Sequence, residues 1–305
     1  MTSDSPQSPE SSLGAVRFAE GGEIEIAYET FGSSDDPTLV LISGLGSQLL
    51  GWDMEFCLEL AGRGFRVVRF DNRDVGLSTH LHEAGVPDLS PLLRGQPITA
   101  APYLLADMAQ DVADLLTALE IERAHIVGAS MGGMIAQEVA ARHPERTLSL
   151  TSIMSTPSPG VGAPTPQALA VLLAPPATTE EEAATSAVAV SRVIGSPDYP
   201  ADEARLRAAA AEAFRRASDP GGFTRQLAAI QVSGDRTEGL RSVAAPTLVL
   251  HGEADPLVQL PGGQATAAAV PGARLVTFSG MGHDLPRQLW PQIISEIASH
   301  AAAAG

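Results

Sequence analysis

Residues 124–133 are Ala-His-Ile-Val-Gly-Ala-Ser-Met-Gly-Gly. This apolar run leads into a serine flanked by small residues and is the most informative stretch of the chain. The pattern G-x-S-x-G predicts a sharp turn between a strand and a helix. Side chains two positions on either side of Ser130 would collide in so tight a turn, and glycine at 128 and 132 removes that collision. The hydroxyl of Ser130 is then held clear at the positive end of a helix, where we expect a nucleophile.

Short apolar runs recur along the chain and end in loop residues, which is typical of parallel strands covered on both faces. Polar and apolar residues alternate at 23–28, which predicts a half-buried antiparallel strand. Residues 104–119 and 292–301 carry apolar stripes at helical spacing. The buried strands are predicted at residues 38–42, 66–70, 125–127, 148–153, 247–250 and 274–278. Strands that alternate with helices predict an α/β protein with a mostly parallel sheet and helices on both faces.

Residues 157–240 interrupt this alternation. They show no strand pattern but several alanine-rich helical patterns punctuated by prolines. We therefore predict a helical cap, or lid, inserted over the carboxyl end of the sheet, where open α/β sheets bind ligands. The core domain then consists of residues 14–156 and 241–303. Residues 1–13, which are polar and rich in Ser and Pro, are predicted to be a disordered tail.

Ser130 needs two partners, because a serine hydroxyl is a poor nucleophile near neutral pH without a base and an acid that orients the base. In α/β proteins that carry the nucleophile in such a strand-to-helix turn, the order along the chain is Ser, acid, His. The acid and the histidine each lie in a loop after a late strand. His283 follows the strand predicted at 274–278, and two glycines let its loop bring the ring to Ser130. We therefore assign His283 as the base.

The acid is expected in the loop after the strand predicted at 247–250. This loop contains Glu253 and Asp255. We assign Asp255, because the proline that follows it marks the loop that carries the acid. Glu253 and Asp284 remain the competing assignments.

Two backbone N–H groups are expected to bind the oxyanion that develops when Ser130 attacks a carbonyl group. The first belongs to Met131, directly after the nucleophile. The second comes from the loop after the strand that ends at Ile42, in which we choose Leu45. We interpret Asp71, Arg73 and Asp74 as an ion-paired loop that braces this oxyanion segment.

The substrate pocket is assigned to Gly44 and Trp52, with the side chain of Met131 also lining it; core packing is the alternative for Trp52. The predicted cap is rich in Leu, Val and Ala and poor in aromatic residues. An aliphatic roof of this kind favours uncharged, fairly apolar esters as substrates.

Charge and composition exclude several function classes. The formal net charge of −17 repels phosphate backbones and anionic lipid, so we expect no nucleic-acid partner. The sequence contains no run of about 18 apolar residues, so we expect no membrane span. The first residues lack the pattern of a secretory signal, and we therefore expect a cytoplasmic protein. A homodimer is left open.

The remaining reactive side chains are interpreted as structural. The single cysteine, Cys57, excludes an internal disulfide and is expected to be a buried, unreactive thiol. No phosphate-binding loop follows an early strand, so no nucleotide cofactor is expected. We predict no metal site, because the other histidines show no metal-ligand spacing with nearby carboxylates. They are His80, His82, His125, His143, His251 and His300.

Two motifs carry a resemblance to a known family. Residues 70–78, Phe-Asp-Asn-Arg-Asp-Val-Gly-Leu-Ser, are similar to the loop after the fourth strand of esterase-like α/β hydrolases, and residues 280–283, Gly-Met-Gly-His, resemble their histidine loop. The chain resembles the α/β-hydrolase superfamily over residues 14–303, nearest to its aclacinomycin methylesterase-like branch. The resemblance implies an eight-stranded sheet, no cofactor, and Ser130, Asp255 and His283 as the triad. One departure is Ser-Gly at 43–44, where many members carry His-Gly.

These residues predict a serine hydrolase that cleaves small to medium, fairly apolar carboxylic esters through an acyl-enzyme. Its partner is then a small-molecule ester. Other bonds remain alternatives on the same triad: a methyl ester of a bulky polyketide-type acid, a lactone, a C–C bond, or cofactor-free perhydrolysis. A ligand-binding receptor built on the same fold is the non-enzyme alternative.

Overall fold

A sheet of eight strands forms the centre of the protein, in a computed structural model that describes residues 15–305. The strand order is β1-β2-β4-β3-β5-β6-β7-β8. The first three strands in this order pair antiparallel, and all other neighbours pair in parallel. The strands are β1 (Arg17–Gly21), β2 (Ile24–Phe31), β3 (Thr38–Ile42), β4 (Arg66–Phe70), β5 (Ala124–Ala129), β6 (Thr147–Ile153), β7 (Thr247–Gly252) and β8 (Arg274–Phe278). The predicted α/β-hydrolase fold class is confirmed.

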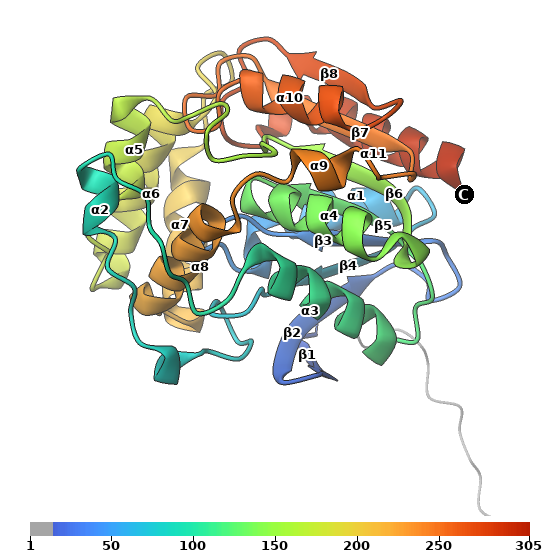
Figure 1. Ribbon diagram of the computed structural model, residues 1–305, viewed down its shortest axis with the longest axis horizontal. Helices are drawn as coiled ribbons and strands as arrows, with labels where there is room; N and C mark the ends of the chain where they lie inside the picture. The colour runs from blue at the N-terminus through green and yellow to red at the C-terminus, as the bar shows by residue number, and fades with distance from the viewer. Residues whose placement is uncertain (1–14) are drawn as a thin grey trace, which may run out of the picture.

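Both faces of the sheet are buried under helices (Figure 1). In β3, Leu39 and Leu41 belong to one apolar cluster and Val40 and Ile42 to the other, and none of the four is exposed. This is why the strand reads as a continuous apolar run. One face packs on α1 (Met54–Ala61) and α11 (Trp290–Ala304), and the other on α3 (Leu105–Ala118), α4 (Met131–Arg142) and α10 (Pro261–Ala269).

The segment between β6 and β7 is helical and contains no strand, as predicted from its sequence. Aspartate or threonine side chains accept N–H groups at the start of several of these helices; Asp219, for example, caps α8. The helices are α5 (Pro166–Leu172), α6 (Glu180–Ile194), α7 (Glu203–Arg216), α8 (Pro220–Ser233) and α9 (Thr237–Leu240). In Figure 1, α5 to α8 gather on one side of the molecule, near the short helix α2 (Ser90–Leu93).

The predicted disordered tail, residues 1–13, lies outside the residues that the structure describes. The boundaries of the core and the cap stay predictions. No helix in residues 15–305 combines the length and the apolar character that a membrane crossing needs.

His125 makes the stability of the fold sensitive to acid. It lies buried in β5, and burial lowers its pKa from 6.5 to about 4. Between these two pKa values the unfolded chain binds a proton that the folded chain does not bind. The contribution of His125 to the stability of the folded state is therefore complete above about pH 6.5 and is lost as the pH falls toward 4. Between pH 7 and pH 5 this one group should lower the free energy of unfolding by about 2 kcal/mol.

Urea unfolding at pH 7 and pH 5 measures this loss. In His125→Gln, which retains a polar group near Ser149, we expect the loss between the two pH values to be smaller by that amount. Equal losses in the variant and the unchanged protein would show that His125 does not carry the effect.

Candidate active site

Ser130 lies in a strained turn between β5 and α4. Its backbone angles are φ 56° and ψ −120°, a conformation that residues with side chains rarely adopt. A Cβ atom added at Gly128 would overlap the carbonyl of Gly132, and one added at Gly132 would overlap the carbonyl of Ile42. The two glycines are therefore required by close backbone approach on both sides of the serine.

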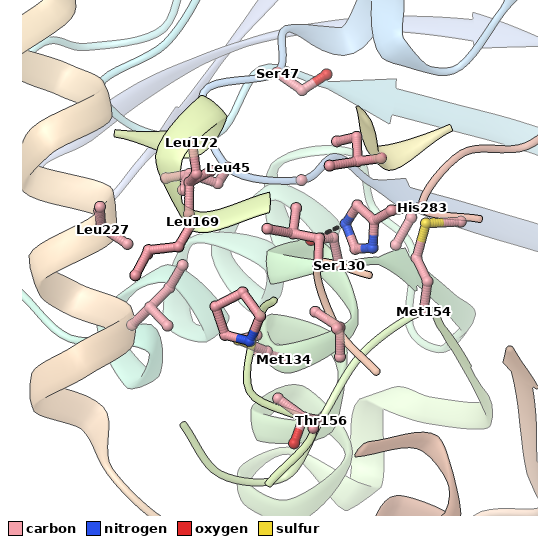
Figure 2. A pocket seen from close by; sticks show the side chains of 18 of the residues that line it. Leu45, Ser47, Ser130, Met134, Met154, Thr156, Leu169, Leu172, Leu227 and His283 are labelled. Atoms are coloured by element: carbon pink, nitrogen blue, oxygen red, sulfur yellow. Dashed lines mark hydrogen bonds between the residues drawn. The ribbon is translucent and has the colours of Figure 1, made fainter. Parts of the chain in front are cut away.

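The side chains of Ser130, His283 and Asp255 form a continuous series of hydrogen bonds. The Nε2 atom of His283 lies 2.9 Å from the Oγ atom of Ser130, and its Nδ1 atom lies 2.7 Å from Oδ2 of Asp255. The dashed line in Figure 2 marks the hydrogen bond between Ser130 and His283. The other carboxylate oxygen of Asp255 accepts the N–H groups of Leu257 and Val258 at 2.8 and 2.9 Å. The loop backbone therefore holds the carboxylate with one oxygen aimed at the ring.

Neither competing acid reaches His283. Glu253 accepts a hydrogen bond from the hydroxyl of Thr277 at 2.7 Å. Asp284 accepts one from the hydroxyl of Ser196, and burial raises its pKa. Of the three carboxylates weighed from the sequence, the structure brings only Asp255 into hydrogen-bond contact with the ring.

The end of α6 positions the histidine loop, and sequence reasoning did not identify these residues. The N–H group of His283 donates to the carbonyl oxygen of Ile194 at 2.6 Å. The hydroxyl of Ser196 accepts the N–H group of Gly282 at 2.9 Å. A Cβ atom at Gly282 would overlap the backbone of Gly195, so a side chain there would push the loop away from α6.

The loop after β3 lies directly beside the serine. A Cβ atom added at Gly44 would come to 3.4 Å from the Cβ atom of Ser130. Within residues 15–305 the N–H group of Leu45 makes no hydrogen bond, whereas that of Gly46 donates to Oε1 of Gln226 at 2.8 Å. Met131 is the first residue of α4, where an N–H group has no acceptor within the helix. Both expected donors are thus free to bind an oxyanion.

Gln226 of α8 is a further residue of the site that was not predicted from the sequence. Its side chain has no solvent exposure, and its Nε2 atom donates to the carbonyl of Arg73 at 2.7 Å while its Oε1 atom holds Gly46. It therefore ties the loop after β3 to the loop after β4. A buried amide this far along the chain carries no local pattern that would have revealed the contact.

The acidic loop after β4 braces the oxyanion segment, but its ion partners come from other helices. Oδ1 of Asp71 accepts the N–H group of Leu49 at 2.7 Å, and Asn72 donates to the carbonyl of Ser43 at 3.0 Å. The ion pairs of this loop are Asp71–Arg216, Asp74–Arg225 and Arg73–Asp111. Two of these arginines belong to α7 and α8, so the inserted segment is clamped to the core beside the site.

A cavity of about 1110 Å³ opens above Ser130 and His283. Its walls are mostly aliphatic, and Figure 2 shows Leu169 and Leu172 facing Ser130 across it. Among residues 15–305 no arginine lines it, and the sequence contains no lysine. A site of this kind offers an anionic substrate no cation to pair with its charge.

The two residues assigned to the pocket, Gly44 and Trp52, both line this cavity. The alternative for Trp52 also has support, because the ring is 2% exposed and packs against Phe56. The assignment of the Met131 side chain to the pocket is wrong. It is fully buried in the core cluster that includes residues of α3, and it is not among the residues that line the cavity.

Cys57 is buried in α1, as expected. Burial raises the pKa of its thiol to about 12. The thiol therefore stays protonated near neutral pH and is no competitor to Ser130 as a nucleophile.

Comparison with known proteins identifies the family. A model of the alpha/beta hydrolase fold family matches residues 37–286. The chain belongs to this family. The predicted membership of the α/β-hydrolase superfamily is thus confirmed, and the protein is a hydrolase of the α/β family.

Two curated relatives span nearly the whole chain. It is similar to rhodomycin D methylesterase from Streptomyces sp. (strain C5), with 29% identity over 95% of this chain and 99% of that protein. The rhodomycin D methylesterase of Streptomyces peucetius is 28% identical over the same shares. Two proteins named as methylesterases therefore match nearly the full length of this hydrolase.

Solved structures share the fold. The enol-lactonase from Burkholderia xenovorans LB400 superimposes with a TM-score of 0.73 at 24% identity, covering 94% of this chain and 100% of that one. A hydrolase from Pseudomonas aeruginosa PA01 gives 0.68 at 26% identity, with 96% and 99% coverage.

Proposed function

We propose that this α/β hydrolase cleaves carboxylic esters of uncharged, apolar acids through an acyl-enzyme on Ser130. The observation that carries the proposal is the hydrogen-bonded series from Ser130 through His283 to Asp255, placed at the floor of an apolar cavity. Nucleophile, base and orienting acid are the three groups that a serine needs to attack a carbonyl carbon.

In the first half of the reaction, Oγ of Ser130 attacks the ester carbonyl while Nε2 of His283 takes the hydroxyl proton. Asp255 holds the proton on Nδ1 and stabilises the imidazolium that forms. The N–H groups of Met131 and Leu45 bind the oxyanion of the tetrahedral intermediate. As that intermediate collapses, the bond to the alcohol breaks and His283 gives its proton to the departing oxygen.

In the second half, water attacks the acyl-enzyme carbonyl, and His283 takes the proton of the water. The new intermediate collapses, the bond to Ser130 breaks, and the serine recovers its proton from His283. The products are one carboxylic acid and one alcohol for each ester and water consumed. The sequence of steps requires no cofactor.

The cavity indicates the substrate class. An ionised group buried without a partner costs several kcal/mol, and this cavity offers no arginine or lysine to pair with it. Its volume of about 1110 Å³ lies at the upper end for small-molecule sites, which favours a second candidate, the methyl ester of a bulky acid. The similarity to rhodomycin D methylesterases supports the same candidate.

Residues 157–240 act in this proposal as a cap over the substrate. Their helices supply Leu169, Leu172 and Leu227 to the cavity wall, opposite Ser130 (Figure 2). The same segment holds the histidine loop through Ile194 and the loop after β3 through Gln226. The cap therefore supplies both apolar contacts to the acyl group and support for the reacting residues.

A matched pair of substrates tests the preference for uncharged acids. Methyl octanoate and monomethyl suberate have chains of similar length, but the second ends in a carboxylate. We expect kcat/KM to be higher for methyl octanoate by about 10²-fold, which corresponds to the cost of burying one unpaired charge. Equal values would contradict the proposed substrate class while leaving the acyl-enzyme mechanism standing.

A second arm compares methyl esters of small acids with those of polycyclic aromatic acids. A higher kcat/KM for the polycyclic esters supports the methylesterase candidate, and a preference for short acyl chains supports a general carboxylesterase. Hydrolysis of lactones in preference to all esters would contradict both.

A further inference from the structure

His80, His82 and Asp219 converge where the loop after β4 meets the start of α8. The Nδ1 atom of His80 lies 2.8 Å from Oδ2 of Asp219, and that of His82 lies 3.7 Å from the same oxygen. One ligand atom from each of the three residues lies within 4.8 Å of the others. We propose that these side chains bind a divalent transition-metal ion of the Zn²⁺ class and thereby tie the inserted segment to the core.

The separations fit a shared ion. Zn²⁺ binds imidazole nitrogen and carboxylate oxygen at about 2.0–2.2 Å, so the ligand atoms of a tetrahedral site lie roughly 3.3 Å apart. The two separations from Asp219, 2.8 and 3.7 Å, fall on either side of that value. The His82 side chain is 68% exposed, which leaves it room for the small rotation that the site requires.

The contacts of His80 place its Nδ1 atom where it can share an ion with Asp219. Its Nε2 atom lies 3.0 Å from the carbonyl oxygen of Gly76, so this nitrogen carries a proton and donates it. In the neutral ring the lone pair then lies on Nδ1 and faces a carboxylate oxygen, which is also an acceptor. A metal ion on Nδ1 resolves this contact, and histidine ligands commonly donate their second N–H to a backbone carbonyl in this way.

The carboxylate of Asp219 is held in place by other contacts. Its Oδ1 atom accepts the N–H group of Gly221, and its Oδ2 atom accepts a hydrogen bond from Arg225 at 2.9 Å. The positive charge of Arg225 is balanced by Asp74, which it binds through both carboxylate oxygens. The site therefore keeps the single negative charge of Asp219, within a chain of net charge −17.

The site is separate from the candidate active site. None of the three residues lines the cavity above Ser130. The expectation of no metal site rested on spacing along the chain, and His80 and Asp219 are 139 positions apart. Only the packing of α8 against the loop after β4 brings them together.

Metal binding to the purified full chain tests the inference. After treatment with a chelator and its removal, we expect calorimetric titration with Zn²⁺ to give one ion per chain, and Co²⁺ to give visible d–d absorption. His82→Ala removes an exposed side chain and should weaken Zn²⁺ binding by about 10- to 100-fold. Asp219→Asn should weaken it as well, and His143→Ala, which removes an imidazole elsewhere, should not.

Thermal unfolding gives a readout independent of activity. Zn²⁺ should raise the Tm of the unchanged protein and of His143→Ala, because an ion that binds only the folded state stabilises it. At the same Zn²⁺ concentration it should raise the Tm of His82→Ala by less, because the variant binds the ion more weakly. Absence of saturable Zn²⁺ binding to the folded protein, or equal binding by His82→Ala, would overturn the inference.

Discussion

Replacing Ser130 with alanine is expected to lower kcat by about 10⁴- to 10⁶-fold on p-nitrophenyl esters. The variant keeps the cavity and both N–H donors but has no oxygen within reach of Nε2 of His283, which lies 2.9 Å from the hydroxyl in the native site. Without a nucleophile no acyl-enzyme forms, so only the oxyanion donors and substrate binding still accelerate hydrolysis. Initial rates under saturating ester measure the effect.

A fluorophosphonate probe gives a second readout of the same residue. Mass spectrometry should locate the adduct on Ser130 in the unchanged protein and detect none in Ser130→Ala. Ser242→Ala, which removes an exposed serine after α9, should keep both labelling and activity. A folded Ser130→Ala variant with native activity would disprove the mechanism. A native protein that neither labels nor turns over esters would instead support the ligand-binding alternative.

The second large effect is expected for Asp255→Asn, with kcat lowered on the order of 10⁴-fold. Oδ1 of Asp255 accepts two backbone N–H groups, from Leu257 and Val258, so the amide oxygen of asparagine must occupy that position. Its NH₂ group then faces Nδ1 of His283. The ring is forced to carry its proton on Nε2, the nitrogen that must accept the proton of Ser130, and the base is blocked.

The thermal midpoint and a matched variant separate this effect from a change of fold. Asp255→Asn should keep a Tm close to that of the unchanged protein while it loses activity, because asparagine can still accept the N–H groups of Leu257 and Val258. Glu253→Gln changes a carboxylate on the same loop that accepts a hydrogen bond from Thr277 and does not contact the ring of His283, and it should keep native kcat. If Glu253→Gln lost activity while Asp255→Asn kept it, the assignment of the acid would have to be exchanged.

Local patterns in the sequence were sufficient for most of the sheet. The strands predicted at 38–42, 66–70 and 274–278 have the bounds that the structure shows, because each is an apolar run closed by turn residues. The strand β1 was missed, since it lies at the sheet edge and Phe18 is 52% exposed, so no apolar run marks it. The helices predicted at 104–119 and 292–301 begin and end within one to three residues of the ends of α3 and α11.

Neighbouring residues were enough to predict the tight turn at Ser130 and the loops of Asp255 and His283 that follow their strands. These features are local, because they depend on the spacing of glycines and on where each apolar run ends. The contacts that support those loops depend on the packing of distant segments, as for the hydrogen bond of Gln226 to a loop 180 residues earlier and the contact of His80 with Asp219. Such contacts join single polar side chains from distant segments, and no periodicity along the chain encodes a pairing that exists only after the helices have packed.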